Sequence, residues 1–306
     1  MKLNTQMTVN RITDEIWEIP TSEKPGMLVP ARIYATRGIL QAMDSGVFEQ
    51  VTNVACLPGI RRYALCMPDG HWGYGFPIGG VAAFDAADGI ISPGGVGYDI
   101  NCGMRLIRTD LTLADVQPHL ERLMTELFRA VPAGVGASGF VRLSGEEFGR
   151  VMTHGAKWCV ERGYGWHRDL VRMEEGGCIE GADSSIVTDH AIKRGINQLG
   201  TLGSGNHYLE VQVVSNEGIF DPVTAAALGI TGHEQIVVMV HCGSRGFGHQ
   251  VASDYLKVFE QCMGRYGITV KDQQLACAPF RSPEGQEYFS AMNCAANTAF
   301  ANRQVI

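Results

Sequence analysis

The chain has 306 residues, 45% of them hydrophobic, and a formal net charge of −7. This length suits one large domain or two ordinary ones with a sizeable core. The acidic balance argues against a general nucleic-acid coat, but it leaves a local basic groove open because net charge is silent about distribution. The 38 glycines indicate many tight turns and close backbone approaches.

The cysteines and the apolar segments bear on the cellular compartment. Nine cysteines are spread along the chain without a CxxC pair. The first 20 residues lack the apolar core of a signal peptide, and no apolar run approaches the roughly 18 residues of a membrane span. We therefore expect a cytoplasmic protein with reduced thiols, most of them buried as small hydrophobic residues.

The first half of the chain predicts an entry segment, a β-rich region and a helix. The entry segment is expected to end in a helix over residues 31–43. Short apolar runs broken by glycine and proline predict a compact β region over 51–110. Residues 112–131 predict an amphipathic helix, because apolar residues recur every three or four positions and Thr112 with Asp115 fits a capping box.

The second half predicts two strands beside glycine turns. Residues 133–185 are expected to form helix and loop, and a glycine turn then leads into a strand from Tyr208 to Val214. The apolar run from Ile236 to Val240 is typical of a strand buried on both faces, and a glycine loop and a helix follow it. Strands and helices interleave without strict βαβ alternation, which favours an α+β fold.

Four side chains beside these turns have the chemistry of metal ligands. Asp99 and Cys102 lie in the stretch GYDINCGMR, His207 precedes a strand and His241 ends one. A carboxylate, a thiol and two imidazoles held at turns suit a metal site. The alternatives are a turn-capping aspartate, an inert buried thiol and structural histidines, because sequence alone does not bring these residues together. Asn101 is interpreted as a turn residue only.

Several stretches taken in order carry a family resemblance. They are MPDGHWGYGFPIGGVAAFD, GIISPGGVGYDINCGMRLIRT, GTLGSGNHYLEVQ, VHCGSRGFGHQVASDY and the tail SPEGQEYFSAMNCAANTAFANRQVI. From about residue 25 to 306 the chain closely resembles the RtcB-type tRNA-splicing RNA ligases. The resemblance implies an RtcB-like α+β fold in which central β-sheets are flanked by helices and a cleft holds the metal site. It also implies that residues 1–306 are the N-terminal and central portion of a single catalytic domain, without the C-terminal part that carries the guanylylated histidine.

The resemblance further implies an activity and its cofactors. Members of this family are GTP- and manganese-dependent ligases that join RNA 3′-phosphate or 2′,3′-cyclic phosphate ends to 5′-hydroxyl ends, in tRNA splicing or RNA repair. By the resemblance, Cys102 would bridge two Mn²⁺ ions, Asp99 and His207 would complete one of them, and His241 would bind the other. Ligand softness alone would favour zinc, so manganese comes only from the resemblance.

Other residues take weaker assignments from the same resemblance. The family segment that contacts the guanine nucleotide matches Asn206, His207, Tyr208, Leu209 and Glu210. Three arginines are candidates for RNA phosphate contacts, which would make binding salt-dependent: Arg61, Arg62 and Arg245. Asp69 and His71 lie in a family motif without a firm role, and support of the metal ligands is one interpretation.

Two rival functions stay open from the sequence. The chain could be a non-catalytic half of a split ligase, or a metal- and RNA-binding remnant, that works with a complementary C-terminal chain. It could instead be a metal-dependent phosphoester hydrolase in which the same four ligands activate water. Turnover without GTP would mark the hydrolase, and an exposed apolar surface would favour the split ligase. An accessory activator is also compatible with the sequence.

Overall fold

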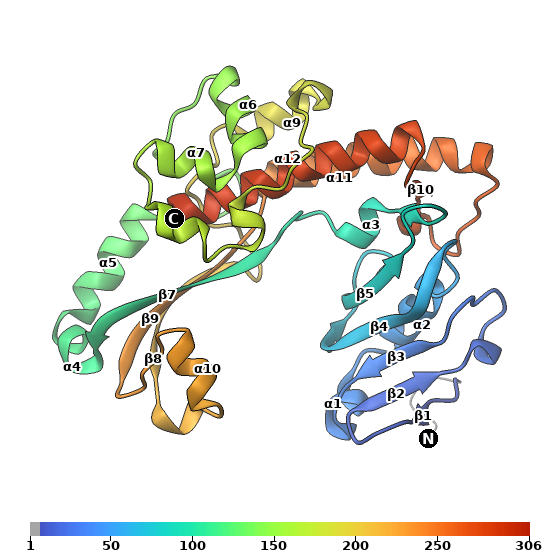
Figure 1. Cartoon of the computed structure of the whole chain (residues 1–306), viewed down its shortest axis with the longest axis horizontal. Helices are drawn as coiled ribbons and strands as arrows, with labels where there is room; N and C mark the ends of the chain where they lie inside the picture. The colour runs from blue at the N-terminus through green and yellow to red at the C-terminus, as the bar shows by residue number, and fades with distance from the viewer. Residues whose placement is uncertain (1–6) are drawn as a thin grey trace. The chain divides into compact units, whose positions relative to one another are not determined.

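The computed structural model describes residues 7–306, which form two compact units (Figure 1). Unit 1 comprises residues 7–98 and Ala252–Ser290, and unit 2 comprises Asp99–Val251 and Ala291–Ile306. The two longest helices, α11 (Arg245–Cys262) and α12 (Pro283–Val305), contribute residues to both units. The single catalytic domain stays a prediction, and the units are described one at a time.

Unit 1 is built on a five-stranded sheet. The strand order is β1-β2-β3-β4-β5, with β3 and β4 parallel and the other neighbours antiparallel. A second, two-stranded sheet pairs β6 with β10. The bounds are β1 (Asn10–Arg11), β2 (Ile16–Ile19), β3 (Ala31–Tyr34), β4 (Ile60–His71), β5 (Ile78–Phe84), β6 (Ile90–Ile91) and β10 (Ala278–Pro279).

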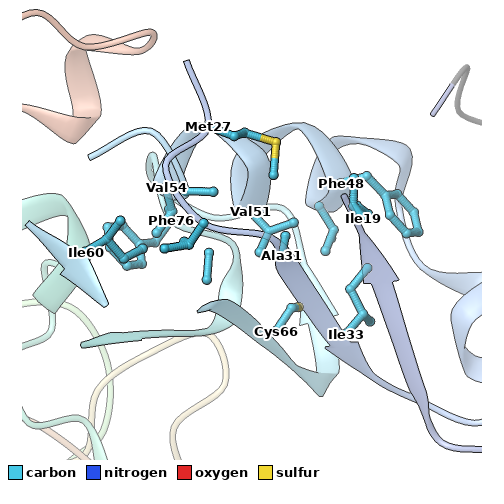
Figure 2. Packing of buried hydrophobic residues seen from close by; sticks show 14 of the residues in the cluster. Ile19, Met27, Ala31, Ile33, Phe48, Val51, Val54, Ile60, Cys66 and Phe76 are labelled. Carbon is cyan, nitrogen blue, oxygen red and sulfur yellow. The ribbon is translucent and has the colours of Figure 1, made fainter. Parts of the chain in front are cut away.

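The core of unit 1 lies between this sheet and helix α2 (Ser45–Val54). Figure 2 shows Val51 and Val54 of α2 among Ala31, Ile33 and Cys66 of the strands, and all five side chains are buried. Side chains alternate across a strand, so every second residue of β3 faces this core. The other helical segments are α1 (Arg37–Ala42), α3 (Pro93–Val96) and three short 3₁₀ turns, Thr21–Glu23, Met263–Tyr266 and Gln273–Leu275.

Two expectations for unit 1 are corrected by the structure. The predicted helix over 31–43 begins as strand β3, and only its second part, from Arg37, is helical. Residues 31–34 form a strand because they pair with β2 on one side and β4 on the other. Thr36 then caps the helix by accepting a hydrogen bond from the Ile39 N–H. The predicted β region from residue 51 also begins with the end of α2, a helix that the sequence reasoning missed.

Unit 2 is built on a three-stranded antiparallel sheet in the order β7-β9-β8 (Figure 1). Its strands are β7 (Gly103–Thr112), β9 (Gln235–Cys242) and β8 (Tyr208–Val214). The predicted strand from Tyr208 to Val214 is confirmed residue for residue, and the predicted buried strand from Ile236 to Val240 forms the middle of β9. Helix α11 follows β9, as predicted.

Short helices flank this sheet and complete the α+β fold that the sequence predicts. They are α4 (Leu113–Val116), α5 (Leu120–Ala130), α6 (Gly145–His154), α7 (Ala156–Glu161), α8 (His167–Leu170), α9 (Asp189–Gly195) and α10 (Pro222–Ala227). Four 3₁₀ turns join them: Gln117–His119, Glu174–Gly177, Ser184–Ile186 and Asn216–Gly218.

The helix predicted over 112–131 differs from the expectation in two respects. Its capping box between Thr112 and Asp115 is present, but a 3₁₀ turn containing Pro118 divides α4 from α5, since proline cannot donate a backbone hydrogen bond. No side chain of α5 is fully buried: Leu123 and Leu127 are half-buried, whereas Leu120, Met124 and Phe128 are exposed, Phe128 to 81%.

The expectations for the cysteines and for membrane spans can be compared with the structure. All cysteines except Cys56 and Cys102 are buried, and within the described residues each of the nine is a free thiol. The expectation of mostly buried thiols is thus confirmed. None of the described helices is both long enough and apolar enough to span a membrane.

Candidate metal centre

The first two predicted ligands lie in the tight turn that precedes β7. The Cys102 N–H donates to the Asp99 carbonyl at 2.9 Å, which closes the turn. Between them Asn101 has a φ of 56°, a left-handed conformation that asparagine tolerates better than most residues. The turn therefore places a carboxylate and a thiol on one short loop at the start of the strand.

The two predicted histidines come from the neighbouring strands. His207 immediately precedes β8, and His241 is the second-last residue of β9. The register pairs Met104 of β7 and Tyr208 of β8 with His241 of the central strand. The imidazole rings of the two histidines consequently approach edge to face, with centroids 5.5 Å apart.

These four side chains meet in the structure. The Cys102 sulfur lies 3.2 Å from Nε2 of His207 and 3.1 Å from Nε2 of His241. Oδ2 of Asp99 lies 2.7 Å from the same Nε2 of His207. The ligand atoms of Asp99, Cys102 and His207 all fall within 4.8 Å of one another. Cys102 is thus shared between an Asp99–His207 group and His241, and the role of these residues as metal ligands stays a prediction.

Two polar atoms in this cluster have no hydrogen-bond partner among residues 7–306. They are Oδ2 of Asp99 and Nδ1 of His207, and both are buried. The close approach of Asp99 Oδ2 to Nε2 is therefore an ionic contact without hydrogen-bond geometry. A buried hydrogen-bond acceptor that is left unpaired costs about 1–3 kcal/mol. A cation bound by the Asp99 carboxylate would offset that cost for Oδ2. The donor set of carboxylate, thiol and imidazoles fits a divalent metal.

The protonation of the cluster follows from its charges. The Asp99 carboxylate, with Cys102, raises the pKa of His207 to about 11. Burial acts to raise the pKa of Asp99, but the contacts with His207 and Cys102 outweigh it and leave the pKa lowered. Desolvation raises the pKa of the Cys102 thiol, and it lowers the pKa of His241 beside the charged His207. A metal must displace these protons, so its affinity rises with pH.

Helix α12 is hydrogen-bonded to the Asp99–Cys102 turn. Arg303 donates from Nη1 to the carbonyl oxygens of Asn101, at 2.6 Å, and Cys242, at 2.7 Å. Its Nη2 donates to Oδ1 of Asn101 at 3.1 Å, and Nδ2 of Asn101 donates to the Ala296 carbonyl at 2.9 Å. The interpretation of Asn101 as a turn residue only is therefore too narrow, because its side chain joins the ligand-bearing turn to α12.

A second residue of α12 holds the segments around both histidines. Oδ1 of Asn302 accepts from the N–H groups of Gly200, at 2.7 Å, and Thr201, at 3.1 Å. Its Nδ2 donates to the carbonyl oxygens of Thr201 and Gly243. Sequence reasoning missed this residue and Arg303. Three asparagines in an alanine-rich helix were the available signal, because asparagine is a poor helix former and competes for backbone hydrogen bonds.

The segment predicted to contact a guanine nucleotide adjoins the two histidines. Asn206 lies in the turn before His207, and Tyr208, Leu209 and Glu210 begin β8. Alternation places Tyr208 and Glu210 on one face of the strand and Leu209 on the other. The Tyr208 ring lies 5.4 Å from that of His241, so one face of this segment continues the candidate metal centre.

Two of the predicted phosphate-binding arginines and both residues without a firm role lie on β4 of unit 1. Arg61 forms ion pairs with Asp88, at 2.8 Å, and Asp85, at 3.2 Å, which occupy its guanidinium. Arg62 is exposed and has a φ of 60°. The remaining two, Asp69 and His71, are exposed, and Nδ1 of His71 lies 2.8 Å from the Asp69 carbonyl oxygen.

The third predicted arginine, Arg245, belongs to unit 2 and makes structural contacts. Its Nε donates to Oγ1 of Thr201 at 3.1 Å, and its Nη2 donates to the Gly134 carbonyl at 2.9 Å. These bonds tie together two loops of the unit. The phosphate contacts of Arg61, Arg62 and Arg245 stay predictions.

Substitution of Asn101 tests its positioning role. We expect Asn101→Ala to weaken Mn²⁺ binding by about 10- to 100-fold, the range typical of residues that orient metal ligands, because the side-chain bonds to Nη2 of Arg303 and to the Ala296 carbonyl are lost. Asn101→Gly removes the same hydrogen bonds but suits the positive φ, so it should bind Mn²⁺ better than the alanine variant. Titration calorimetry measures both affinities. Wild-type affinity in Asn101→Ala would contradict the role.

Comparison with known proteins identifies the family. The family model described as "tRNA-splicing ligase RtcB" matches residues 50–306. A protein of Methanococcus maripaludis, named "tRNA-splicing ligase RtcB", is 51% identical over 299 residues, which are 98% of this chain and 62% of the relative. A protein of the same name from Archaeoglobus fulgidus is 52% identical over 304 residues, 99% of this chain and 62% of the relative.

A bacterial relative agrees with the archaeal ones. The "RNA-splicing ligase RtcB" of Mycobacterium tuberculosis is 52% identical over 260 residues, 84% of this chain and 60% of the relative. This chain thus spans about three fifths of the length of the curated relatives it matches. With a family match over most of its residues and relatives at about half identity, the chain belongs to the RtcB family of tRNA-splicing ligases.

Proposed function

We propose that this chain carries the metal centre of an RNA ligase that joins RNA 3′-phosphate or 2′,3′-cyclic phosphate ends to 5′-hydroxyl ends, with GTP and two Mn²⁺ ions as cofactors. The observation that carries the proposal is the position of the Cys102 sulfur between His207 and His241, with Asp99 beside His207. Membership of the RtcB family, whose members above are named as ligases, supports the RNA substrate.

Each residue of the centre has a part in this proposal. Asp99, Cys102 and His207 would hold one cation, and Cys102 with His241 would hold the second. Bound divalent ions neutralise phosphate oxygens during nucleotidyl transfer. The Asp99 carboxylate and the Cys102 thiolate offset part of the dication charge, while the segment from Asn206 to Glu210 would orient the guanine nucleotide beside them. The donor set by itself favours zinc, so manganese is the part that most needs testing.

A ligation assay tests the activity. The chain is mixed with the segment of the Archaeoglobus fulgidus relative that it does not match, and with two RNA fragments that end in a 3′-phosphate and a 5′-hydroxyl. We expect joined RNA on a denaturing gel only when both GTP and Mn²⁺ are present. Phosphate release without GTP would overturn the proposal in favour of a metal-dependent hydrolase, and joining without GTP would overturn the proposed GTP dependence. Absence of joined RNA from the complete mixture would overturn it as well.

The exposed apolar face of α5 supports a partner for this chain. Leu120 and Met124 are each 44% exposed and Phe128 is 81% exposed, all on one helix. We propose that a complementary polypeptide, corresponding to the additional length of the relatives, covers this face. Gel filtration of the chain with and without the segment described above should show a complex. An accessory activator and a cytoplasmic location, where nine free thiols stay reduced, belong to the same proposal.

A further inference from the structure

A groove of about 920 Å³ runs along β7 in unit 2. Strand β7 is an edge strand of its sheet, and seven of its residues line the groove. The remaining lining residues come from residues 166–174, from the last turns of α12, from the segment that follows α10 and from Asn101. None of the predicted metal, nucleotide or phosphate-binding residues lines it, although Asn101 and Arg303, which hold the turn that carries Asp99 and Cys102, do.

Arginine dominates the charge of this groove. The lining contains five arginines, Arg105, Arg108, Arg168, Arg172 and Arg303. It contains three carboxylates, Asp110, Asp169 and Glu174. The five arginines exceed the three carboxylates by two, so the lining carries a net positive charge, whereas the whole chain has a net charge of −7. A local excess of one sign in a concave site raises the concentration of the opposite charge there.

The arginines of the groove differ in what they already bind. Arg108 is paired with Asp110 at 2.7 Å. Arg105 donates to Oε1 of Gln304, a neutral acceptor, at 2.6 Å, and this bond links β7 to α12. Arg168 and Arg172 are exposed, and no carboxylate among residues 7–306 forms an ion pair with either. These two guanidinium groups are therefore free to contact an anion.

An aromatic face accompanies the two unpaired arginines. Trp166 lines the same groove, and 65% of its surface is exposed although tryptophan is highly buried on average. The Arg168 guanidinium lies 5.0 Å from the centre of its ring. Unpaired arginines beside an exposed aromatic ring are the combination by which proteins bind single-stranded nucleic acid, because bases stack on the ring while the cations follow the backbone.

The groove also reaches the turn of the candidate metal centre. Its lining includes Asn101 and Gly103, the two residues on either side of Cys102. Arg303, which holds Asn101, lines it as well. A single-stranded nucleic acid bound along β7 would therefore reach the loop that carries Cys102.

We propose that this groove binds a single-stranded segment of RNA, with Arg168 and Arg172 on its phosphates and Trp166 stacked on a base. The inference rests on the proposed RNA ligase function and deepens it by assigning a substrate-binding surface. An acidic peptide would use the two arginines but gains little from the exposed indole, so the aromatic contact separates the two ligands. The contact is non-covalent and requires no metal.

Binding of a labelled RNA in EDTA tests the inference without the metal centre. The probe is a fluorescein-labelled RNA of about 12 nucleotides, within the site sizes known for single-strand binders, followed by fluorescence anisotropy at several salt concentrations. The double variant Arg168→Ala/Arg172→Ala should reduce the slope of log affinity against log salt by about 1.4, because each phosphate contact on a single strand contributes about 0.7. Trp166→Ala should weaken binding about 5- to 100-fold, and Trp166→Phe should recover part of the loss.

Matched controls come from exposed residues outside the groove. Arg122→Ala/Arg129→Ala on α5 removes two exposed arginines, and Trp72→Ala removes an exposed tryptophan of unit 1. Both should bind the RNA as the wild-type chain does. The inference is overturned if the groove variants keep wild-type affinity and salt slope, if the wild-type chain does not bind the probe, or if polyglutamate competes as well as unlabelled RNA. Since the assay contains neither GTP nor metal, failure here leaves the ligation result unaffected.

Discussion

Cys102→Ala is expected to abolish the binding of both Mn²⁺ ions, the largest effect of any single substitution in the candidate metal centre. Its sulfur lies within 3.2 Å of Nε2 of both imidazoles, so its loss removes a ligand from each proposed ion. Residues that only orient a metal ligand change affinity by about 10- to 100-fold, and loss of a shared ligand should exceed that range. Titration calorimetry with Mn²⁺, repeated with Zn²⁺, measures the effect.

Two further variants separate a shared ligand from a general disturbance. His241→Ala leaves Asp99, Cys102 and His207 in place, so it should lose one ion and keep the other. Cys56→Ala changes a half-buried thiol of unit 1 and should bind two ions like the wild-type chain. Equal loss of both ions in His241→Ala, or one ion retained in Cys102→Ala, would contradict the bridging role.

The parts of the fold that the sequence predicts are those in which local pattern and tertiary pairing agree. Strand β9 has a continuous apolar run and is the central strand of its sheet, so pattern and burial point to the same structure. In residues 31–34 they disagree, because helix-compatible residues are drawn into β3 by pairing on both sides. The face of α5 shows a third case, in which a correct helical pattern does not imply burial within the chain.

The candidate site also has features that local sequence predicts and features that only the fold determines. The sequence predicts the ligand types and their places beside turns, since each of the four lies next to a glycine-rich loop or at a strand end. Their convergence depends on the register that sets Met104, His241 and Tyr208 side by side, which no local pattern specifies. The supporting bonds from Arg303 span about 200 residues of sequence, to Asn101, and only the folded chain reveals them.

Asn302→Ala is expected to give the largest loss of stability among the polar substitutions in unit 2. The side chain is 1% exposed, and its removal leaves two N–H groups, of Gly200 and Thr201, and two carbonyl groups, of Thr201 and Gly243, without this partner. Each unsatisfied buried group costs about 1–3 kcal/mol, and partial relaxation brings the expected total to about 3 kcal/mol. Urea unfolding, with the slope checked for a change in cooperativity, measures the loss.

The same substitution should reach the metal centre, because Asn302 holds the segment before His207 and the residues just after His241. Hydrogen exchange at the Gly200 and Thr201 amides should accelerate in Asn302→Ala, and Mn²⁺ affinity should fall with it. Gln286→Ala on the same helix removes one exposed hydrogen bond and should change stability by no more than about 0.5 kcal/mol. Unchanged exchange together with weakened Mn²⁺ binding would mean that Asn302 acts on the histidines by some route other than these backbone bonds.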